Sequence, residues 1–144
     1  MTRNKLMRLI DALRIEDAIR LAEARTSGEI CVSISGFFIG NARNAAEKAF
    51  KRLKVARTVH HNGVLIFVVP SRRKFVILGD SGIHEKVGAE FWPQVVSGMS
   101  DCFKKEYFTG GIVKGIEHVG AQLATHFPPD LKAGNELPDK VDFA

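Results

Sequence analysis

Three polar residues stand at the ends of the segments whose residues are typical of β-strands. Glu29 opens the first segment, which continues to Ser35 with apolar residues at alternate positions. Asn62 immediately precedes the continuous apolar run 63–69, and Asp80 follows the segment 74–78 after one glycine. Carboxylate and amide oxygens at strand ends are hard ligands, and such ligands suit a divalent cation.

The predicted connections bring these three residues to one edge of a sheet. A helix separates the first strand from the second, which favours a parallel pair, and the starts of parallel strands lie at the same edge. The short turn 70–73 predicts an antiparallel hairpin between the second and third strands. The third strand therefore ends at the edge where the other two begin.

The oxygen-rich character of this edge favours calcium over magnesium. Ca²⁺ accepts about six to eight oxygen ligands in a forgiving geometry, whereas Mg²⁺ requires a stricter octahedron and keeps more water. Zinc is not favoured, because no cysteine and no histidine with a clear role as a ligand is expected at this edge. The predicted ligands of a divalent cation are Glu29, Asn62, Asp80, Ser81 and the carbonyl groups around Gly82.

Ordinary structural roles explain the same residues and stay open at this point. Asp80 or Ser81 is a suitable cap for a short helix beginning near Ile83. Asn62 and the following glycine are typical of a turn that enters a strand. Glu29 is also consistent with a strand end exposed to solvent.

Sequence motifs of the common catalytic and nucleotide sites are absent. The chain has no dinucleotide fingerprint, Walker loop, EF-hand, H-E-x-x-H or G-x-S-x-G pattern. The adjacent His60 and His61 are more typical of an exposed turn than of a metal site. No catalytic residue is assigned. Open parallel sheets bind nucleotides beyond the carboxyl ends of their strands, so a cluster at the amino ends favours an ion.

The remaining periodicity predicts an α/β protein, a three-layer α/β/α sandwich with a small mixed sheet of three to four strands. A fourth strand would lie at an edge but has no clear position in the sequence. Gly111 and Gly115, four residues apart on one predicted helix, would let a neighbouring helix pack closely. Helices are predicted, from apolar residues at helical spacing, over 13–25, 41–57, 89–104 and 109–126.

Length and charge indicate one domain followed by a polar tail. The 144 residues carry a net charge of +5, with 45% hydrophobic and 26% charged residues. Residues 1–129 are expected to form the domain, and 130–144 a loosely held polar tail. The N-terminal sequence lacks the features of a secretory signal, no apolar run could span a membrane, and the two cysteines have no disulfide-framework or metal-site pattern. These features favour the cytoplasm.

Five segments carry a resemblance to a known family: 26–30, 58–66, 74–83, 91–92 and 108–112. Together they resemble the TPM-domain family, which includes the thylakoid-lumen acid-phosphatase-like and photosystem II repair proteins of plants and many bacterial proteins. The ending 135–139 is similar to that of short bacterial members. The resemblance implies the same sandwich and a divalent-ion site, usually proposed for calcium, on Glu29, Asn62, Asp80 and Gly82. Many relatives have a signal peptide and a membrane anchor, and neither is apparent here.

Three functions follow as hypotheses. The first is a calcium-binding interaction or regulatory module with an unidentified protein partner. A membrane-associated protein is one candidate for that partner. The second is a metal-assisted acid-phosphatase-like hydrolase, in which Asp80 holds the metal or attacks phosphorus and Glu29 orients water. The basic run 72–74, at the opposite sheet end, argues against it. The third, nucleic-acid binding through 48–57 and 72–74, is disfavoured because stacking aromatics are not evident there.

Overall fold

A four-stranded mixed sheet forms the centre of the protein. The computed structural model describes residues 1–88, 90–130, 137 and 139–144. The strands are β1 (Glu29–Ile34), β2 (Gly63–Val69), β3 (Lys74–Gly79) and β4 (Asp142–Phe143), in the order β3-β2-β1-β4. As predicted, β1 and β2 are parallel and β2 and β3 are antiparallel.

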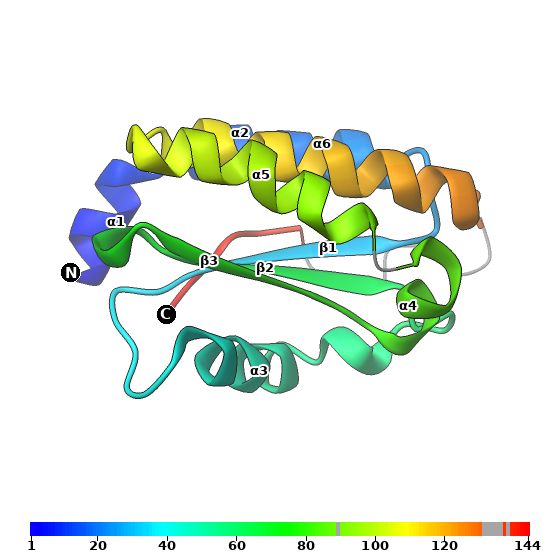
Figure 1. Cartoon of the computed structure of the whole chain (residues 1–144), viewed down its shortest axis with the longest axis horizontal. Coiled ribbons are helices and arrows are strands. Elements are labelled where there is room, and N and C mark those ends of the chain that lie inside the picture. The colour runs from blue at the N-terminus through cyan, green and yellow to red at the C-terminus, as the bar shows by residue number, and fades with distance from the viewer. Residues whose placement is uncertain (89, 131–136, 138) are drawn as a thin grey trace.

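Helices cover both faces of the sheet, which confirms the three-layer sandwich (Figure 1). One face carries α2 (Ala12–Glu23), α5 (Phe91–Lys104) and α6 (Phe108–His126), and the other carries α3 (Ala42–Arg52). The short helix α4 (Ser81–Val87) follows β3 at the end of the sheet. In the part of the chain that the structure describes, no helix has the length and apolar character needed to cross a membrane.

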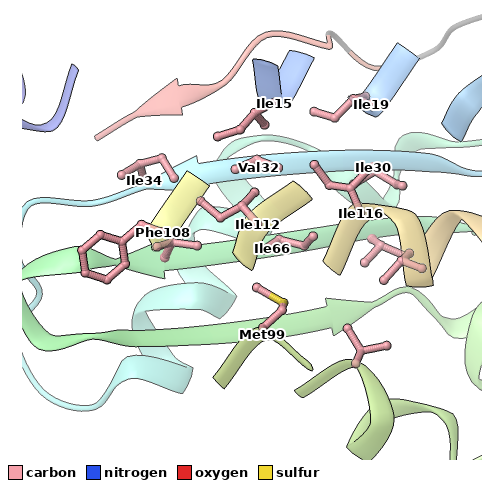
Figure 2. Packing of buried hydrophobic residues seen from close by; sticks show 14 of the residues in the cluster. Ile15, Ile19, Ile30, Val32, Ile34, Ile66, Met99, Phe108, Ile112 and Ile116 are labelled. Carbon is pink, nitrogen blue, oxygen red and sulfur yellow. The ribbon is translucent and has the colours of Figure 1, made fainter. Parts of the chain in front are cut away.

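Alternation along the strands divides the core into two layers. Figure 2 shows the larger layer, in which isoleucines of α2 and α6 pack over β1 and β2. On the other face, Cys31 and Leu65 pack against Ala46 and Ala49 of α3. Every residue of β2 is buried, as expected for a central strand. The labelled members of the larger layer are Ile15, Ile19, Ile30, Val32, Ile34, Ile66, Met99, Phe108, Ile112 and Ile116.

Two glycines of α6 allow α5 to approach closely, as the sequence predicts. A Cβ atom added at Gly111 would lie 2.8 Å from the Phe103 ring, and one at Gly115 would lie 2.5 Å from Met99 Sδ. These separations are too short for ordinary packing. The absence of a side chain at both positions therefore sets the distance between the two helices.

Two helical features differ from the sequence prediction. Helix α1 (Arg3–Leu9) was not predicted; the Thr2 hydroxyl accepts a hydrogen bond from the Lys5 amide, and Leu6 is buried. The helix predicted over 41–57 begins after the expected cap, Asn41, but ends at Arg52. A short 3-10 helix (Val55–Arg57) follows, because Lys54 adopts a left-handed conformation with φ of 56° that breaks the α-helix.

The end of the tail is held in the sheet, so the expectation of a loose segment is wrong there. Strand β4 lies parallel to β1, and the Ala144 amide donates to the Ile34 carbonyl oxygen at 2.9 Å. The Asp142 carboxylate accepts from the Ser33 hydroxyl and forms two hydrogen bonds with the Arg52 guanidinium. Of the ending 135–139, only residues 137 and 139 lie within the described part of the chain.

The charge pair beside β4 fixes the ionised state of Asp142. Burial alone would raise the pKa of this carboxyl group. Hydrogen bonds from Arg52 and Ser33, with the positive charges of Arg52 and Arg3, outweigh burial and lower the pKa below its ordinary value. The carboxylate is therefore charged near neutral pH and holds β4 against both β1 and α3.

Candidate functional site

The predicted meeting of strand ends occurs at the amino edge of β1 and β2. Glu29 is paired with Gly63, and the Asp80 amide donates to the Gly63 carbonyl oxygen at 2.9 Å. The Glu29 amide donates to the Asn62 carbonyl oxygen at 3.3 Å. Because β2 lies between β1 and β3, the backbones of Glu29 and Asp80 are separated by about 10 Å, two strand spacings. The residues share an edge, but their backbones are not adjacent.

The Asp80 side chain caps α4, which confirms the ordinary explanation offered for it. One carboxylate oxygen accepts from the Ser81 amide at 2.8 Å, and the other lies 3.2 Å from His61 Nδ1. A cap uses only part of the capacity of a carboxylate, which has about four lone-pair positions. The capping role and a role as a metal ligand are therefore compatible.

Gly82 lies against the backbone of the preceding loop. Its amide donates to the His61 carbonyl oxygen at 2.9 Å. A Cβ atom at this position would lie 2.4 Å from the His60 carbonyl oxygen and 2.7 Å from that of His61. Only glycine fits here, and the close approach brings two carbonyl oxygens to the start of α4, beside Asp80.

Asn62 carries an unsatisfied oxygen at this edge. The residue has 0% exposure; its backbone amide donates to the Thr58 hydroxyl, and its side-chain Nδ2 donates to the Ser27 hydroxyl at 3.3 Å. Within the described residues, Oδ1 is buried and accepts no hydrogen bond. An unsatisfied buried oxygen costs about 1–3 kcal/mol. The environment of Asn62 therefore suits an additional donor or a cation.

Glu29 is not the solvent-exposed strand end that one explanation of the sequence required. Its exposed fraction is 2%, and Oε1 accepts a hydrogen bond from the Leu137 amide at 2.9 Å. The carboxylate thus fastens the C-terminal segment to the beginning of β1. This contact separates the role of Glu29 from that of Asp80.

Two further acids near Glu29, Glu23 and Asp139, were not identified from the sequence. Glu23 accepts a hydrogen bond from the Ile30 amide at 2.9 Å, and its carboxyl group is hydrogen-bonded to Asp139. Burial, the hydrogen bond with Asp139 and the charges of Asp139 and Glu29 raise the pKa of Glu23 to about 9, although the Ile30 amide opposes the shift. Glu23 therefore carries a proton near neutral pH and can donate it to Asp139.

One signal in the sequence could have revealed Glu23. It lies four residues after Ile19 and eight after Ile15, in line with two residues that are fully buried. An acid on the apolar side of a helix needs a partner, because burial of an isolated charge is costly. Asp139 gives no comparable signal, since its position depends on the placement of the tail.

These acids also affect the pKa of the Cys31 thiol. Burial raises the pKa of Cys31 to about 12, with a contribution from the negative charges that Glu23, Glu29, Asp139 and Asp142 carry at such high pH. The thiol is therefore protonated and a poor nucleophile or metal ligand near neutral pH.

The remaining polar residues of the edge are histidines paired with carboxylates. His60 Nε2 lies 3.0 Å from Asp130, and His61 is exposed while it contacts Asp80. Across the described ranges, no group of three or more histidine, cysteine, aspartate or glutamate side chains has the geometry to hold a metal ion. A cation at this edge would need amide, carbonyl and water oxygens in addition to a carboxylate.

The architecture defines the class of protein: a three-layer α/β domain with a small mixed sheet and a polar amino edge. The model of the TPM domain matches residues 5–122. The chain belongs to the TPM-domain family. No curated protein sequence matches this chain.

Solved structures that share the fold include the following three. The NMR structure of the BA42 protein from the psychrophilic bacterium Bizionia argentinensis is 37% identical, with a TM-score of 0.86, over 94% of this chain and 95% of that chain. The N-terminal domain of cg2496 from Corynebacterium glutamicum is 17% identical, with a TM-score of 0.61, over 77% and 70% of the two chains. The N-terminal domain of a P. gingivalis protein is 15% identical, with a TM-score of 0.67, over 83% and 79%. The last two likenesses show the fold alone.

Proposed function

We propose that this TPM domain binds a divalent cation, calcium in preference to magnesium, and acts as an interaction or regulatory module without catalytic activity. The observation that supports the proposal best is the Asn62 Oδ1 atom, which is buried and accepts no hydrogen bond within the described residues. A cation beside this oxygen would remove the cost of leaving it unsatisfied.

The proposed ligands divide into two groups. Asn62 and Asp80 supply side-chain oxygens. The backbone that lies against Gly82 supplies the carbonyl oxygens of His60 and His61. Ser81 adds a hydroxyl group at the first position of α4. Glu29 contributes negative charge at the same edge while it holds the Leu137 amide. Calcium suits this set because it tolerates irregular oxygen ligands and can complete its coordination with water.

A titration of chelator-treated protein with Ca²⁺ and Mg²⁺, followed by amide NMR shifts, tests the proposal. The informative variant is Asp80→Asn, since asparagine is also a good helix cap and should keep α4 intact. We expect its calcium affinity to fall about tenfold or more because a charged ligand is lost. Glu85→Gln removes the same charge from the exposed face of α4 and serves as the matched control.

The shifts should centre on Asn62, Asp80 and Gly82 and should be larger with calcium. Equal affinities in Asp80→Asn and in the control would remove Asp80 from the site. The absence of shifts at millimolar calcium would leave these residues with the capping and turn roles alone.

The arrangement of charges supports the hydrolase hypothesis less well, because Lys51 lines a hollow with Asp80 but the densest basic run is distant from it. Stabilisation of a phosphoryl group needs cations close to the reacting oxygens. Arg72 and Arg73 lie at the turn between β2 and β3, at the opposite end of these strands from Asp80, and Arg73 pairs with Glu106. We therefore favour the binding module.

A reducing compartment such as the cytoplasm remains our expectation. Cys31 is buried, Cys102 is half-buried, and both are free thiols. Free cysteines of this kind are typical of proteins from compartments that keep thiols reduced.

A further inference from the structure

The loop between β1 and α3 presents two large apolar side chains to solvent. Phe37 is 69% exposed and Ile39 is 88% exposed, whereas Phe38 between them is partly buried and packs against the smaller core layer. Figure 1 shows this loop projecting beyond the sheet, on the side that carries α3. Two exposed apolar residues on either side of an anchored one form a short apolar tip.

Contacts at the base of the loop hold the tip in place. The Ser35 hydroxyl donates to the Phe37 carbonyl oxygen at 2.8 Å, and the Ser71 hydroxyl donates to that of Gly36 at 3.2 Å. The Gly36 amide donates to the Ala144 carbonyl oxygen at 3.2 Å. The exposure of Phe37 and Ile39 is therefore a feature of a tethered loop.

Basic side chains surround this tip. Lys48 and Arg52 line the same hollow as Phe37 and Ile39, and the Arg72 guanidinium lies 4.6 Å from the centre of the Phe38 ring. Arg52 is neutralised by Asp142, but Lys48 and Arg72 have no ion-pair partner among the described residues. The surface around the apolar tip is thus cationic.

We propose that the 37–39 loop docks the protein on a bilayer surface that contains anionic phospholipids. Phe37 and Ile39 would enter the region between headgroups and acyl chains, and Lys48 and Arg72 would lie beside the headgroup phosphates. Apolar insertion and electrostatic attraction act together in such peripheral binding, since either contribution alone is weak. The long lysine and arginine side chains can follow the headgroups while their stems cover apolar surface.

Charge favours a membrane over a second copy of the chain. Two copies that met through this loop would bring their Lys48 and Arg72 side chains together, and like charges at an interface oppose association. The tip exposes the ring of Phe37 but its other exposed residue, Ile39, is aliphatic, so it gives no series of rings on which successive bases of a single strand could stack. An anionic bilayer satisfies both the apolar tip and the surrounding cations.

The proposed surface is separate from the proposed cation site. Strand β1 begins at Glu29, at the edge that holds Asn62 and Asp80, and ends at Ile34, just before the loop. The two regions therefore lie at opposite ends of β1. Variants of the loop should leave calcium binding unchanged, which allows the two proposals to fail independently.

Co-sedimentation of the full chain with lipid vesicles tests this inference. We expect binding to phosphatidylcholine vesicles that contain about a third phosphatidylserine, weak binding to phosphatidylcholine alone, and a decline as salt is added. The double variant Phe37→Ser/Ile39→Ser should lose about tenfold or more of its partition to the anionic vesicles. The matched control is Leu13→Ser/Leu21→Ser, which removes two leucines of α2 that are each 73% exposed.

The variant Lys48→Gln/Arg72→Gln should lose the preference for anionic lipid, and amide spectra should confirm that each variant is folded. Equal binding by the Phe37→Ser/Ile39→Ser variant and the wild-type chain would overturn the proposal, because general basicity would then explain the binding. Failure of the wild-type chain to bind either vesicle would also overturn it. If the wild-type chain binds no vesicles but self-associates, and the Phe37→Ser/Ile39→Ser variant does not self-associate, the tip would be assigned to contact with a second copy of the chain.

Discussion

At the scale of single residues, the proton on Glu23 links the C-terminal segment to the body of the domain. The pKa of this group is raised from 4.5 to about 9 by burial, by the hydrogen bond to Asp139 and by neighbouring negative charge. A folded-state pKa above the unfolded-state value stabilises the fold fully below about pH 4.5. This contribution declines as pH rises through the interval up to about 9.

The variant Glu23→Gln tests this linkage. Glutamine can accept from the Ile30 amide and donate to Asp139, as the protonated acid does, but it has no proton to lose. We expect similar stability of variant and wild type near about pH 5, and a variant more stable by about 1 kcal/mol or more near about pH 8. Urea unfolding of the chelator-treated proteins at several pH values provides the measurement.

Glu117→Gln is a suitable control for this experiment, since it removes an exposed acid of α6 and leaves Glu23 in place. Its stability should retain the decline with pH that the wild-type protein shows. Parallel pH profiles for Glu23→Gln and wild type would show that Glu23 does not hold a proton in the folded state.

At the scale of elements, the contact between α5 and α6 depends on a glycine with no room for a side chain. A Cβ at Gly111 would lie 2.8 Å from the Phe103 ring and 3.0 Å from Cys102 Cβ, whereas one at Gly110 would meet no atom within 4 Å. These adjacent positions have the same residue type in the same helix. They therefore form a matched pair.

We expect Gly111→Ala to destabilise the fold by about 1–2 kcal/mol. Overpacking costs about 1–3 kcal/mol, and the better helix propensity of alanine returns up to about 1 kcal/mol. Gly110→Ala should be neutral or stabilising by up to about 1 kcal/mol, because only the propensity changes. Chemical denaturation of both variants measures the difference. Equal effects at the two positions would mean that α5 moves away from α6 at little cost.

Periodicity was enough to predict the elements whose residues alternate or repeat clearly. The apolar run of β2 has no competing explanation, and its predicted bounds agree with the structure. Helix α1 and strand β4 lack such patterns, since α1 buries Leu6 alone and β4 has two residues. Their positions come from contacts with distant segments, such as Ser33 with Asp142, which local sequence does not encode.

The candidate site was predictable to the same extent. Strand direction alone brought Glu29, Asn62 and Asp80 to one edge, as the register confirms. The burial of Glu29 and its contact with Leu137 were not predictable, because both depend on where the tail lies. The sequence therefore predicted which edge of the sheet carries the polar residues. Only the structure shows that the acids of this edge form two separate groups, Asp80 in one and Glu23, Glu29 and Asp139 in the other.

At the scale of the whole molecule, the C-terminal segment connects the two ends of β1. Leu137 binds Glu29 at the amino end of the strand, and Ala144 contacts Ile34 and Gly36 at its carboxyl end. The proposed cation site lies near the first contact and the proposed membrane-docking loop near the second. Because β1 lies inside the sheet between β2 and β4, cation binding at its amino end should stabilise the entire fold.

We therefore expect calcium to raise the thermal unfolding midpoint of the wild-type chain. A ligand that binds only the folded state adds about 2.7 kcal/mol at a concentration 100 times its Kd. For a domain of this length, that corresponds to a rise of roughly 10 °C in Tm. Calorimetry at several calcium concentrations should show the rise in wild type and in Glu85→Gln, but not in Asp80→Asn.

The same experiment distinguishes the two acidic groups of the edge. A rise that persists in Asp80→Asn but disappears in Glu29→Gln would place the cation beside Glu23, Glu29 and Asp139, where burial and then neighbouring negative charge raise the pKa of Glu23. In that case calcium should also promote loss of the Glu23 proton, since a cation favours the charged carboxylate. Proton release measured during the titration would then accompany binding, because the protonated Glu23 would take part in the site.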